Sequence, residues 1–316
     1  MKTSFFPSLS GRLAKTQLAP ALFALILACA FAFRISYLRA PVSYDEAYNF
    51  LSYSQGHWLN AIAKYNLPNH ALHSLLTYWA QLAFGISTLA LRSVPFFAGA
   101  GLIVIAPLLW RQLTREENIS DTSKFVLFFF PAALCAVNFR LIHYSVESRG
   151  YALETLLFVF SLIAAERVLS TKSRLWPAAY ALSAALATLT LLSHIFALVS
   201  IGLWMLACAD REKFRRIIGT QLMTAFFLAF FYLPIILYVA AVGTKLEGPE
   251  SWLDLPQAIL QKTVDLIHSW QADMTLAGFY WFLCGLFLAG VIFRRRLSWK
   301  LDRKSTRLNS SHRCLS

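Results

Sequence analysis

The sequence predicts an all-α integral membrane protein with about eight transmembrane helices. Of its 316 residues, 58% are hydrophobic and only 14% are charged, whereas soluble domains have roughly 45–50% and about 25%. Too few polar side chains are present to cover this apolar content in water, which excludes a soluble globular protein. The five cysteines show no zinc-ligand spacing, and the four in apolar segments are interpreted as small buried side chains.

Eight apolar runs predict the transmembrane helices, because about 20 helical residues cross a bilayer of about 30 Å. They lie near 17–38, 88–110, 123–142, 150–168, 175–193, 195–209, 217–241 and 274–293. The sixth run is short and follows the fifth through a tight turn near His194. The run from His70 to Phe84 has 15 residues, so we expect an interfacial or re-entrant helix in the first outer loop.

The basic residues predict the orientation. With a cytoplasmic N-terminus, seventeen Lys and Arg fall at inner span ends and eight at outer ones, as expected of cytoplasmic loops. The net charge of +13 is therefore interpreted as an orientation signal and not as a nucleic-acid-binding surface. The apolar stretch from Leu18 to Phe33 exceeds the about 7–15 residues of a cleaved signal, so the first span is interpreted as an uncleaved signal anchor.

The last residues, 302–316, have an unusual origin in this interpretation. Residues 302–312 can be back-translated into codons that spell a common sequencing adapter, which predicts an assembly artefact after a membrane domain spanning 1–301. The alternative is a basic, Ser-rich cytoplasmic tail. We therefore exclude 302–316 from the fold prediction.

Polar residues gather on the expected outer side. The six histidines before the tail all fall there, namely His57, His70, His73, His143, His194 and His268. The acidic residues of the inner loops, in contrast, alternate with Lys and Arg as in ordinary solvated loops. The outer side is therefore where we expect a functional site.

An acidic pair, Asp45-Glu46, follows the first span within Ser43-Tyr44-Asp45-Glu46. Such a pair at a membrane boundary can act as a general base, bind a metal, or form the polar start of a helix, where carboxylates complement the helix dipole. The residues alone leave these three alternatives open.

Two histidines, His70 and His73, begin the short apolar run and are three residues apart. This spacing places both on one face of a helix, where they could bind a metal or a phosphate. Polar anchoring of the helix at the membrane interface is the alternative.

The turn between the third and fourth spans carries Glu147, Arg149, Tyr151 and Glu154. A guanidinium suits a phosphate because it donates two parallel hydrogen bonds, although a structural ion pair with Glu147 is the alternative for Arg149. Glu154 lies deeper, where an ionised carboxylate is unfavourable by about 2.5–3.5 kcal/mol. It therefore predicts a polar cavity or a partner.

In their order and on their common side, these motifs resemble the GT-C membrane glycosyltransferases. The resemblance covers residues 15–300 and rests on Asp45-Glu46, Asn69-His70-x-x-His73, Leu91-Arg92-Ser93-Val94-Pro95, Glu147-x-Arg149-x-Tyr151-Ala152-Leu153 and Ser193-His194. More narrowly, the chain resembles the bacterial family 39 type, which is related to protein O-mannosyltransferases and to the lipid A aminoarabinose transferase.

The resemblance implies a GT-C fold and an enzyme of the bacterial inner membrane. Such an enzyme transfers a sugar from a polyprenyl phosphate, with inversion, to a lipid, glycan or protein acceptor on the periplasmic side. By position, Asp45 would be the catalytic carboxylate and Glu46 its motif partner. The positions implied to bind substrate are His70, His73, Glu147, Arg149, Tyr151 and His194. The motif His70-Ala71-Leu72-His73 departs from the Pro-rich form common in such enzymes.

No nucleotide cofactor is expected, because the sequence contains neither a G-x-G-x-x-G motif nor a P-loop. A requirement for a divalent metal is left open. A transporter or flippase of lipid-linked sugars is the alternative function, but it should show repeated halves and ionisable groups at the membrane midplane. A non-catalytic membrane scaffold would make the outer cluster incidental.

Overall fold

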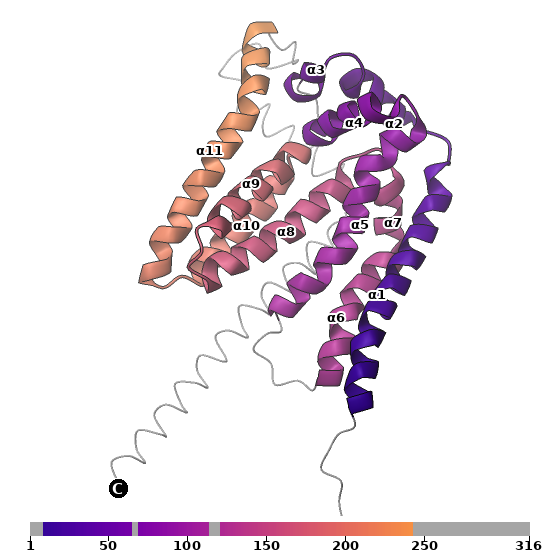
Figure 1. Cartoon of the computed structure of the whole chain (residues 1–316). Coiled ribbons are helices and arrows are strands. Elements are labelled where there is room, and N and C mark those ends of the chain that lie inside the picture. The colour runs from indigo at the N-terminus through magenta and orange to yellow at the C-terminus, as the bar shows by residue number, and fades with distance from the viewer. Residues whose placement is uncertain (1–8, 65–68, 114–120, 243–316) are drawn as a thin grey trace, which may run out of the picture. The chain divides into compact units, whose positions relative to one another are not determined.

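The computed structural model describes residues 9–64, 69–113 and 121–242, and every regular element among them is helical. The chain divides into two units, 1–243 and 244–316, and only the first contains described residues. The helices of this unit are α1 (Leu9–Leu38), α2 (Tyr44–Asn49), the π-helix η1 (Phe50–Ser54), α3 (Trp58–Ala63), α4 (Ala71–Phe84), α5 (Thr88–Leu113), α6 (Asp121–Val137), α7 (Phe139–Val146), α8 (Tyr151–Ser170), α9 (Leu175–Thr190), α10 (His194–Ala207) and α11 (Arg211–Val242) (Figure 1).

Within the described residues, three helices are long and apolar enough to cross a membrane: Pro20–Leu38, Thr88–Leu113 and Lys213–Leu237. They coincide with the first, second and seventh predicted spans, which are confirmed to this extent. The all-helical fold class is likewise confirmed for the described residues.

The third predicted span, 123–142, is broken. α6 and α7 are bent by 62° where they meet, and Asn138 between them has an extended backbone and accepts a hydrogen bond from the Leu141 N–H. Arg34 of α1 is buried and donates to the carbonyl oxygens of Cys135 and Ala136 at the end of α6. The break is thus stabilised on both sides, because a new helix is capped and the carbonyls of the old one are satisfied.

The remaining predicted spans are not confirmed. α8 has 20 residues but carries Glu154, Glu166 and Arg167, and it is not among the three candidates. α9 and α10 have 16 and 14 residues, fewer than the about 20 that a bilayer requires. The eighth predicted span, 274–293, and the tail 302–316 lie outside the described residues. The tight turn near His194 is confirmed, since α9 ends at Thr190 and α10 begins at His194.

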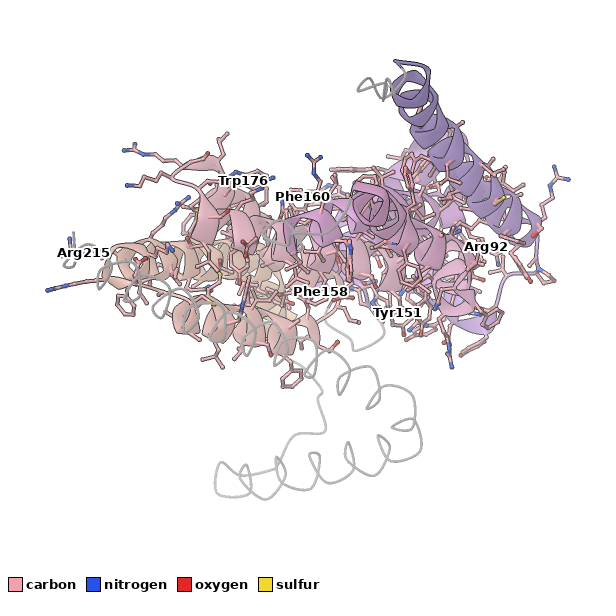
Figure 2. All side chains as sticks on the ribbon, turned by 90° about the horizontal axis from the view of Figure 1, so that it is seen from below. Arg92, Tyr151, Phe158, Phe160, Trp176 and Arg215 are labelled. Atoms are coloured by element: carbon pink, nitrogen blue, oxygen red, sulfur yellow. The ribbon has the colours of Figure 1, made fainter. Side chains whose placement is uncertain are left out.

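The helices form two groups, which contact each other through α5 and α8, α7 and α8, α4 and α9, and α3 and α11. α5 also contacts α1, α4, α6 and α7, whereas α9 contacts α8, α10 and α11. The view from below shows this division, with Arg92 of α5 toward one side and Trp176 of α9 and Arg215 of α11 toward the other (Figure 2). Alanines fill the contact between α8 and α9, where Ala164, Ala165, Ala181, Ala184 and Ala185 are fully buried, because small residues let helix backbones approach closely.

The segment between α1 and α5 folds into the short helices α2, η1, α3 and α4, which gather at one end of the unit (Figure 1). The predicted helix from His70 to Phe84 corresponds to α4. It ends at Gly85, whose φ of +72° favours glycine. The polar residues singled out from the sequence lie at this end.

The contact between α5 and α7 requires a glycine at position 99. A Cβ added there would lie 2.6 Å from the Cβ of Ser145, so Gly99→Ala should push the two helices apart and destabilise the protein by about 1–3 kcal/mol. A lowered thermal unfolding midpoint in detergent would measure this. Gly219→Ala on α11 is the matched control, because nothing lies within 4 Å of its added Cβ, and it should leave the midpoint unchanged or raise it. Equal midpoints for both variants would contradict the close contact.

Candidate functional site

Glu46 is a buried carboxylate at this end of the molecule, and both of its oxygens are hydrogen-bonded. Its carboxylate accepts hydrogen bonds from Nε and Nη2 of Arg92, at 2.9 and 2.8 Å, and from the Ser148 N–H at 2.7 Å. It also closes a capping box with Ser43 at the start of α2. Burial alone would raise the pKa of Glu46, but the hydrogen bonds from Arg92, Ser43 and Ser148 outweigh it and lower the pKa. The helix-cap alternative is therefore confirmed for Glu46.

Arg92 joins three parts of the chain through the same guanidinium. Besides Glu46, its Nη1 donates to the carbonyl oxygens of Tyr37, Leu38 and Ala40 where α1 ends, and its Nη2 donates to Pro41. This buried residue therefore ties the end of α1 and the start of α2 to α5. An arginine bonded to successive carbonyls at a helix end satisfies groups that the helix itself leaves unpaired.

Asp45 lies beside Glu46 in sequence but in a different environment. Its side chain is 63% exposed, and its Oδ2 lies 2.9 Å from Nη1 of Arg149, which is 13% exposed. Two residues predicted from separate motifs are thus brought into one ion pair. The carboxylate of Asp45 is accessible to solvent, whereas that of Glu46 is not.

His70 and Tyr151 hold the Arg149 side chain from other directions. Its Nε donates to His70 Nε2 at 3.2 Å, and its Nη2 donates to the Tyr151 hydroxyl at 3.3 Å. His70 Nδ1 lies 3.1 Å from the carbonyl oxygen of Thr190, which can only accept, so the proton belongs on Nδ1 and Nε2 is free to accept from Arg149. Burial, followed by the charge of Arg149, lowers the pKa of His70 to about 4, so His70 is neutral at pH 7.

Gly150 allows these segments to meet. A Cβ at this position would lie 2.8 Å from Cγ2 of Thr190 and 2.9 Å from Cβ of His70. The start of α8 can therefore pack directly against the start of α4 and the end of α9. This close approach brings Arg149 and Tyr151 to His70.

His73 does not share the exposed part of this cluster. It is 1% exposed, its Nε2 lies 3.5 Å from Thr77 Oγ1, and its Nδ1 has no partner among the described atoms. Burial lowers its pKa to about 3. The predicted common face of His70 and His73 is thus a buried face of α4.

Glu147 has a different partner from the one considered in the sequence. The structural ion-pair alternative for Arg149 named Glu147, but Arg149 pairs with Asp45, whereas Glu147 lies 3.3 Å from Nδ1 of His143 one turn earlier. Burial raises the pKa of Glu147, although the nearby charges of His143 and Arg149 partly offset this effect.

Glu154 has the partner that its depth predicted, and this partner is His194. Nδ1 of His194 lies 2.7 Å from Glu154 Oε1, and the His194 side chain is fully buried against the ring of Phe158. Its Nε2 has no partner among the described atoms. The pair lies one helical turn along α8 from Gly150, whose carbonyl accepts from the Glu154 N–H.

The roles of the buried arginines Arg92 and Arg34 were not predicted from the sequence. Arg92 was part of a motif but was given no role. Its position beside an apolar span nevertheless indicates a buried partner, because an arginine there requires a carboxylate or several carbonyls. The same signal applied to Arg34. No sequence signal identified the Thr190 carbonyl, since it depends on how α9 packs.

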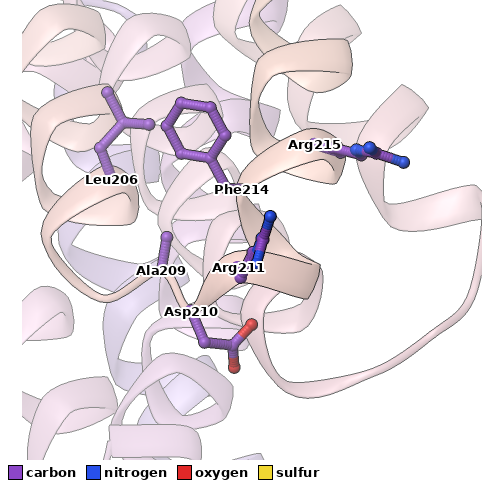
Figure 3. A pocket seen from close by; sticks show the side chains of 6 residues that line it. All are labelled: Leu206, Ala209, Asp210, Arg211, Phe214 and Arg215. Carbon is purple, nitrogen blue, oxygen red and sulfur yellow. The ribbon is translucent and has the colours of Figure 1, made fainter.

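The described residues of the polar cluster do not form a metal-binding group. In the three described ranges, no three His, Cys, Asp or Glu side chains lie close enough to hold a metal. A hollow of about 390 Å³ lies at the turn between α10 and α11 (Figure 3), which is the opposite end of α10 from His194. We place the candidate site at the polar cluster, because Asp45, Arg149 and Tyr151 converge there.

Comparison of the chain with protein-family models, with curated proteins and with solved structures identified no match.

The buried pair predicts a large difference between two neutralising substitutions. Glu46→Gln should lower the free energy of unfolding by roughly 3–5 kcal/mol, because Arg92 is left buried without its counter-charge. Lys213→Gln should change it by less than about 1 kcal/mol, because the Lys213–Asp210 pair is exposed. Thermal midpoints in detergent measure both. If the two variants unfolded at the same temperature, the buried Glu46–Arg92 ion pair would not stabilise the fold as predicted.

The buried histidines predict a loss of stability in acid. Between pH 6.5, their ordinary pKa, and about pH 4, the unfolded chain binds protons that folded His70 and His73 do not. Their contribution is therefore complete above pH 6.5 and is lost as the pH falls.

The unfolding midpoint should fall over this range, and His73→Leu should reduce the slope of midpoint against pH because one of the two groups is removed. His57→Asn is the control. It replaces an exposed histidine at a helix start by another residue that can cap, and it should keep the parental slope. A parental slope in His73→Leu would contradict the prediction.

Proposed function

We propose that this chain is a membrane glycosyltransferase of the GT-C type, in which eight spans surround a site on the periplasmic side of the bacterial inner membrane. It would transfer a sugar from a polyprenyl phosphate to a lipid, glycan or protein acceptor. The proposal is supported by the apolar helices of the described residues and by one contact in particular. This contact is the ion pair between Asp45 and Arg149, two residues from separate motifs of the resemblance.

Asp45 has the accessibility that a general base requires. Its carboxylate is largely exposed and lies next to Glu46, whose buried bonds fix the backbone of the same helical turn. In the proposed reaction, Asp45 takes the proton of the acceptor hydroxyl or amine as the acceptor atom bonds to the anomeric carbon. The bond from that carbon to the phosphate oxygen breaks on the opposite face, which inverts the configuration.

Arg149 is suited to the departing phosphate. It is held by His70 and Tyr151, so its position is set before a ligand arrives. The breaking bond leaves its electron pair on the phosphate oxygen, and a positioned guanidinium stabilises that charge through two hydrogen bonds. Because His70 is neutral, it accepts from Arg149 without repelling it. The polyprenyl tail would remain in the lipid, so no nucleotide-binding domain is needed.

Glu46 and His194 are positioning residues in this proposal. Glu46 has no free carboxylate oxygen for a substrate, so it would keep Asp45 and Arg149 near one another through α2 and Ser148. His194 is buried against Glu154 and would fix the start of α8 relative to α10. His73 is buried as well, and Glu147 faces His143, so their contribution to substrate binding would be indirect.

Transport of lipid-linked sugars is a second candidate, favoured by the break between α6 and α7. Transporters commonly use broken helices with charged groups at the break, and Arg34 bonds to the carbonyls at this one. The outer cluster of Asp45 and Arg149 has no role in that alternative. An assay of transfer therefore separates the two functions.

Replacing the proposed base should stop transfer without affecting the fold. Full-length protein is incubated with a radiolabelled polyprenyl-phosphate sugar and membrane acceptors, and transferred label is counted. Asp45→Asn should lower the rate roughly 100- to 10,000-fold, as expected for loss of a general base. Asp210→Asn, an exposed carboxylate at the other end of α10, should transfer at the parental rate. Near-parental transfer by Asp45→Asn would refute the assignment.

A further inference from the structure

A second polar feature lies far from the proposed active site, at the turn between α10 and α11. The hollow of about 390 Å³ there is lined by Leu206, Ala209, Asp210, Arg211, Phe214 and Arg215 (Figure 3). Its lining thus combines apolar residues with two arginines and Asp210. Nothing in the proposed transfer reaction uses this place.

Neighbouring charges at this turn already have partners. Asp210 lies 3.3 Å from the ammonium group of Lys213, and Arg216 donates to the carbonyl oxygens of Thr171 and Ser173 in the turn between α8 and α9. Arg216 therefore fixes one basic turn against the other, and Lys213 offsets the carboxylate of Asp210.

Arg211 and Arg215 remain as exposed cations. Both are exposed to solvent, and neither forms an ion pair with a described side chain. Figure 2 shows Arg215 extending away from the helices. Two guanidinium groups one turn apart on the same helix can bind one phosphate together, because each donates several hydrogen bonds.

An exposed apolar stripe leads away from the hollow along α11. Phe214, Ile218, Leu222, Phe226 and Phe230 follow one another at intervals of four residues and are all exposed, so each lies beside the next, and the row winds about the helix axis by roughly 40° at each step. The stripe falls within Lys213–Leu237, which is long and apolar enough to cross a membrane. The two arginines therefore lie where an apolar span meets water, at the depth of lipid headgroups.

We propose that this hollow binds the phosphate of an anionic glycerophospholipid, whose acyl chains lie along the apolar stripe of α11. Arg211 and Arg215 bind the phosphate, and Phe214 contacts the upper part of the chains. A lipid fits better than a soluble phosphate because the cations and the stripe are continuous on one helix. The inference is independent of the proposed transferase activity, because it concerns a different end of the molecule.

Lipid titration of the full-length protein tests this assignment. Delipidated protein in neutral detergent is titrated with phosphatidylglycerol or with phosphatidylcholine, and native mass spectrometry measures the bound fraction. The wild type should bind phosphatidylglycerol more tightly. Arg211→Gln/Arg215→Gln should weaken phosphatidylglycerol binding roughly thirtyfold. Each cation near a membrane surface contributes about 1 kcal/mol to the binding free energy, and the loss of two corresponds to this change in the dissociation constant.

Two further variants control for charge and fold. Arg39→Gln/Arg140→Gln removes two other exposed arginines and should bind phosphatidylglycerol like the wild type. Arg211→Lys/Arg215→Lys keeps the charge but not the guanidinium geometry and should lose less affinity than the glutamine variant, which checks that the site tolerates substitution. Inorganic phosphate should fail to displace the lipid at equal concentration.

Three results would overturn the proposal. They are equal binding of both lipids, an equal loss of affinity in the Arg39→Gln/Arg140→Gln variant, and displacement of the lipid by equimolar inorganic phosphate. The last would identify the hollow as a site for a free anion. Because no sugar donor is present, failure here leaves the transferase proposal unaffected, and failure of the transfer assay leaves this proposal unaffected.

Discussion

Burial of the Glu46 carboxylate together with the Arg92 guanidinium is the constraint on which the rest of this end of the molecule depends. Either group alone would be strongly unfavourable away from water, so the chain can bury them only as a pair with every remaining hydrogen bond satisfied. The carbonyls that end α1, the start of α2 and the N–H of Ser148 supply those bonds. Three parts of the chain that are distant in sequence, residues 37–46, Arg92 and Ser148, are thereby fixed around two side chains.

The polar cluster follows from that joint. Ser148 is bonded to Glu46, so Arg149, the next residue, is brought to the turn that carries Asp45. Gly150 then permits α8 to start against His70 and Thr190. Each side chain of the cluster is therefore positioned by its immediate neighbour in the chain. The apolar helices contribute the frame, and the buried ion pair determines which of their ends meet.

The parts that sequence could predict are those that depend on local pattern. The apolar runs that match α1, α5 and α11, the short helix α4 and the turn before His194 follow from run length and helix-ending residues. The partners of Arg149, Glu147 and Glu154 could not be assigned in this way, because a contact between distant segments depends on how helices pack. The bend at Asn138 was missed for a different reason: the surrounding run is apolar enough to cross a membrane, and the effect of one capping side chain does not alter its mean hydropathy.

Asp45 and Glu46 are adjacent in sequence, yet their ion pairs differ in exposure to water. Both partners of the Glu46 pair are buried, whereas the Asp45 carboxylate is 63% exposed, so water screens its contact with Arg149 and weakens that pair. In the structure, the charges of Asp45 and Arg149 offset each other. The phosphate of a donor would compete with Asp45 for Arg149. When the phosphate binds to Arg149, Oδ2 of Asp45 would lose its ion-pair partner. Under the proposed function, donor binding itself would then make the base available. Without the donor, Arg149 would occupy the Asp45 carboxylate and keep it from acting as a base.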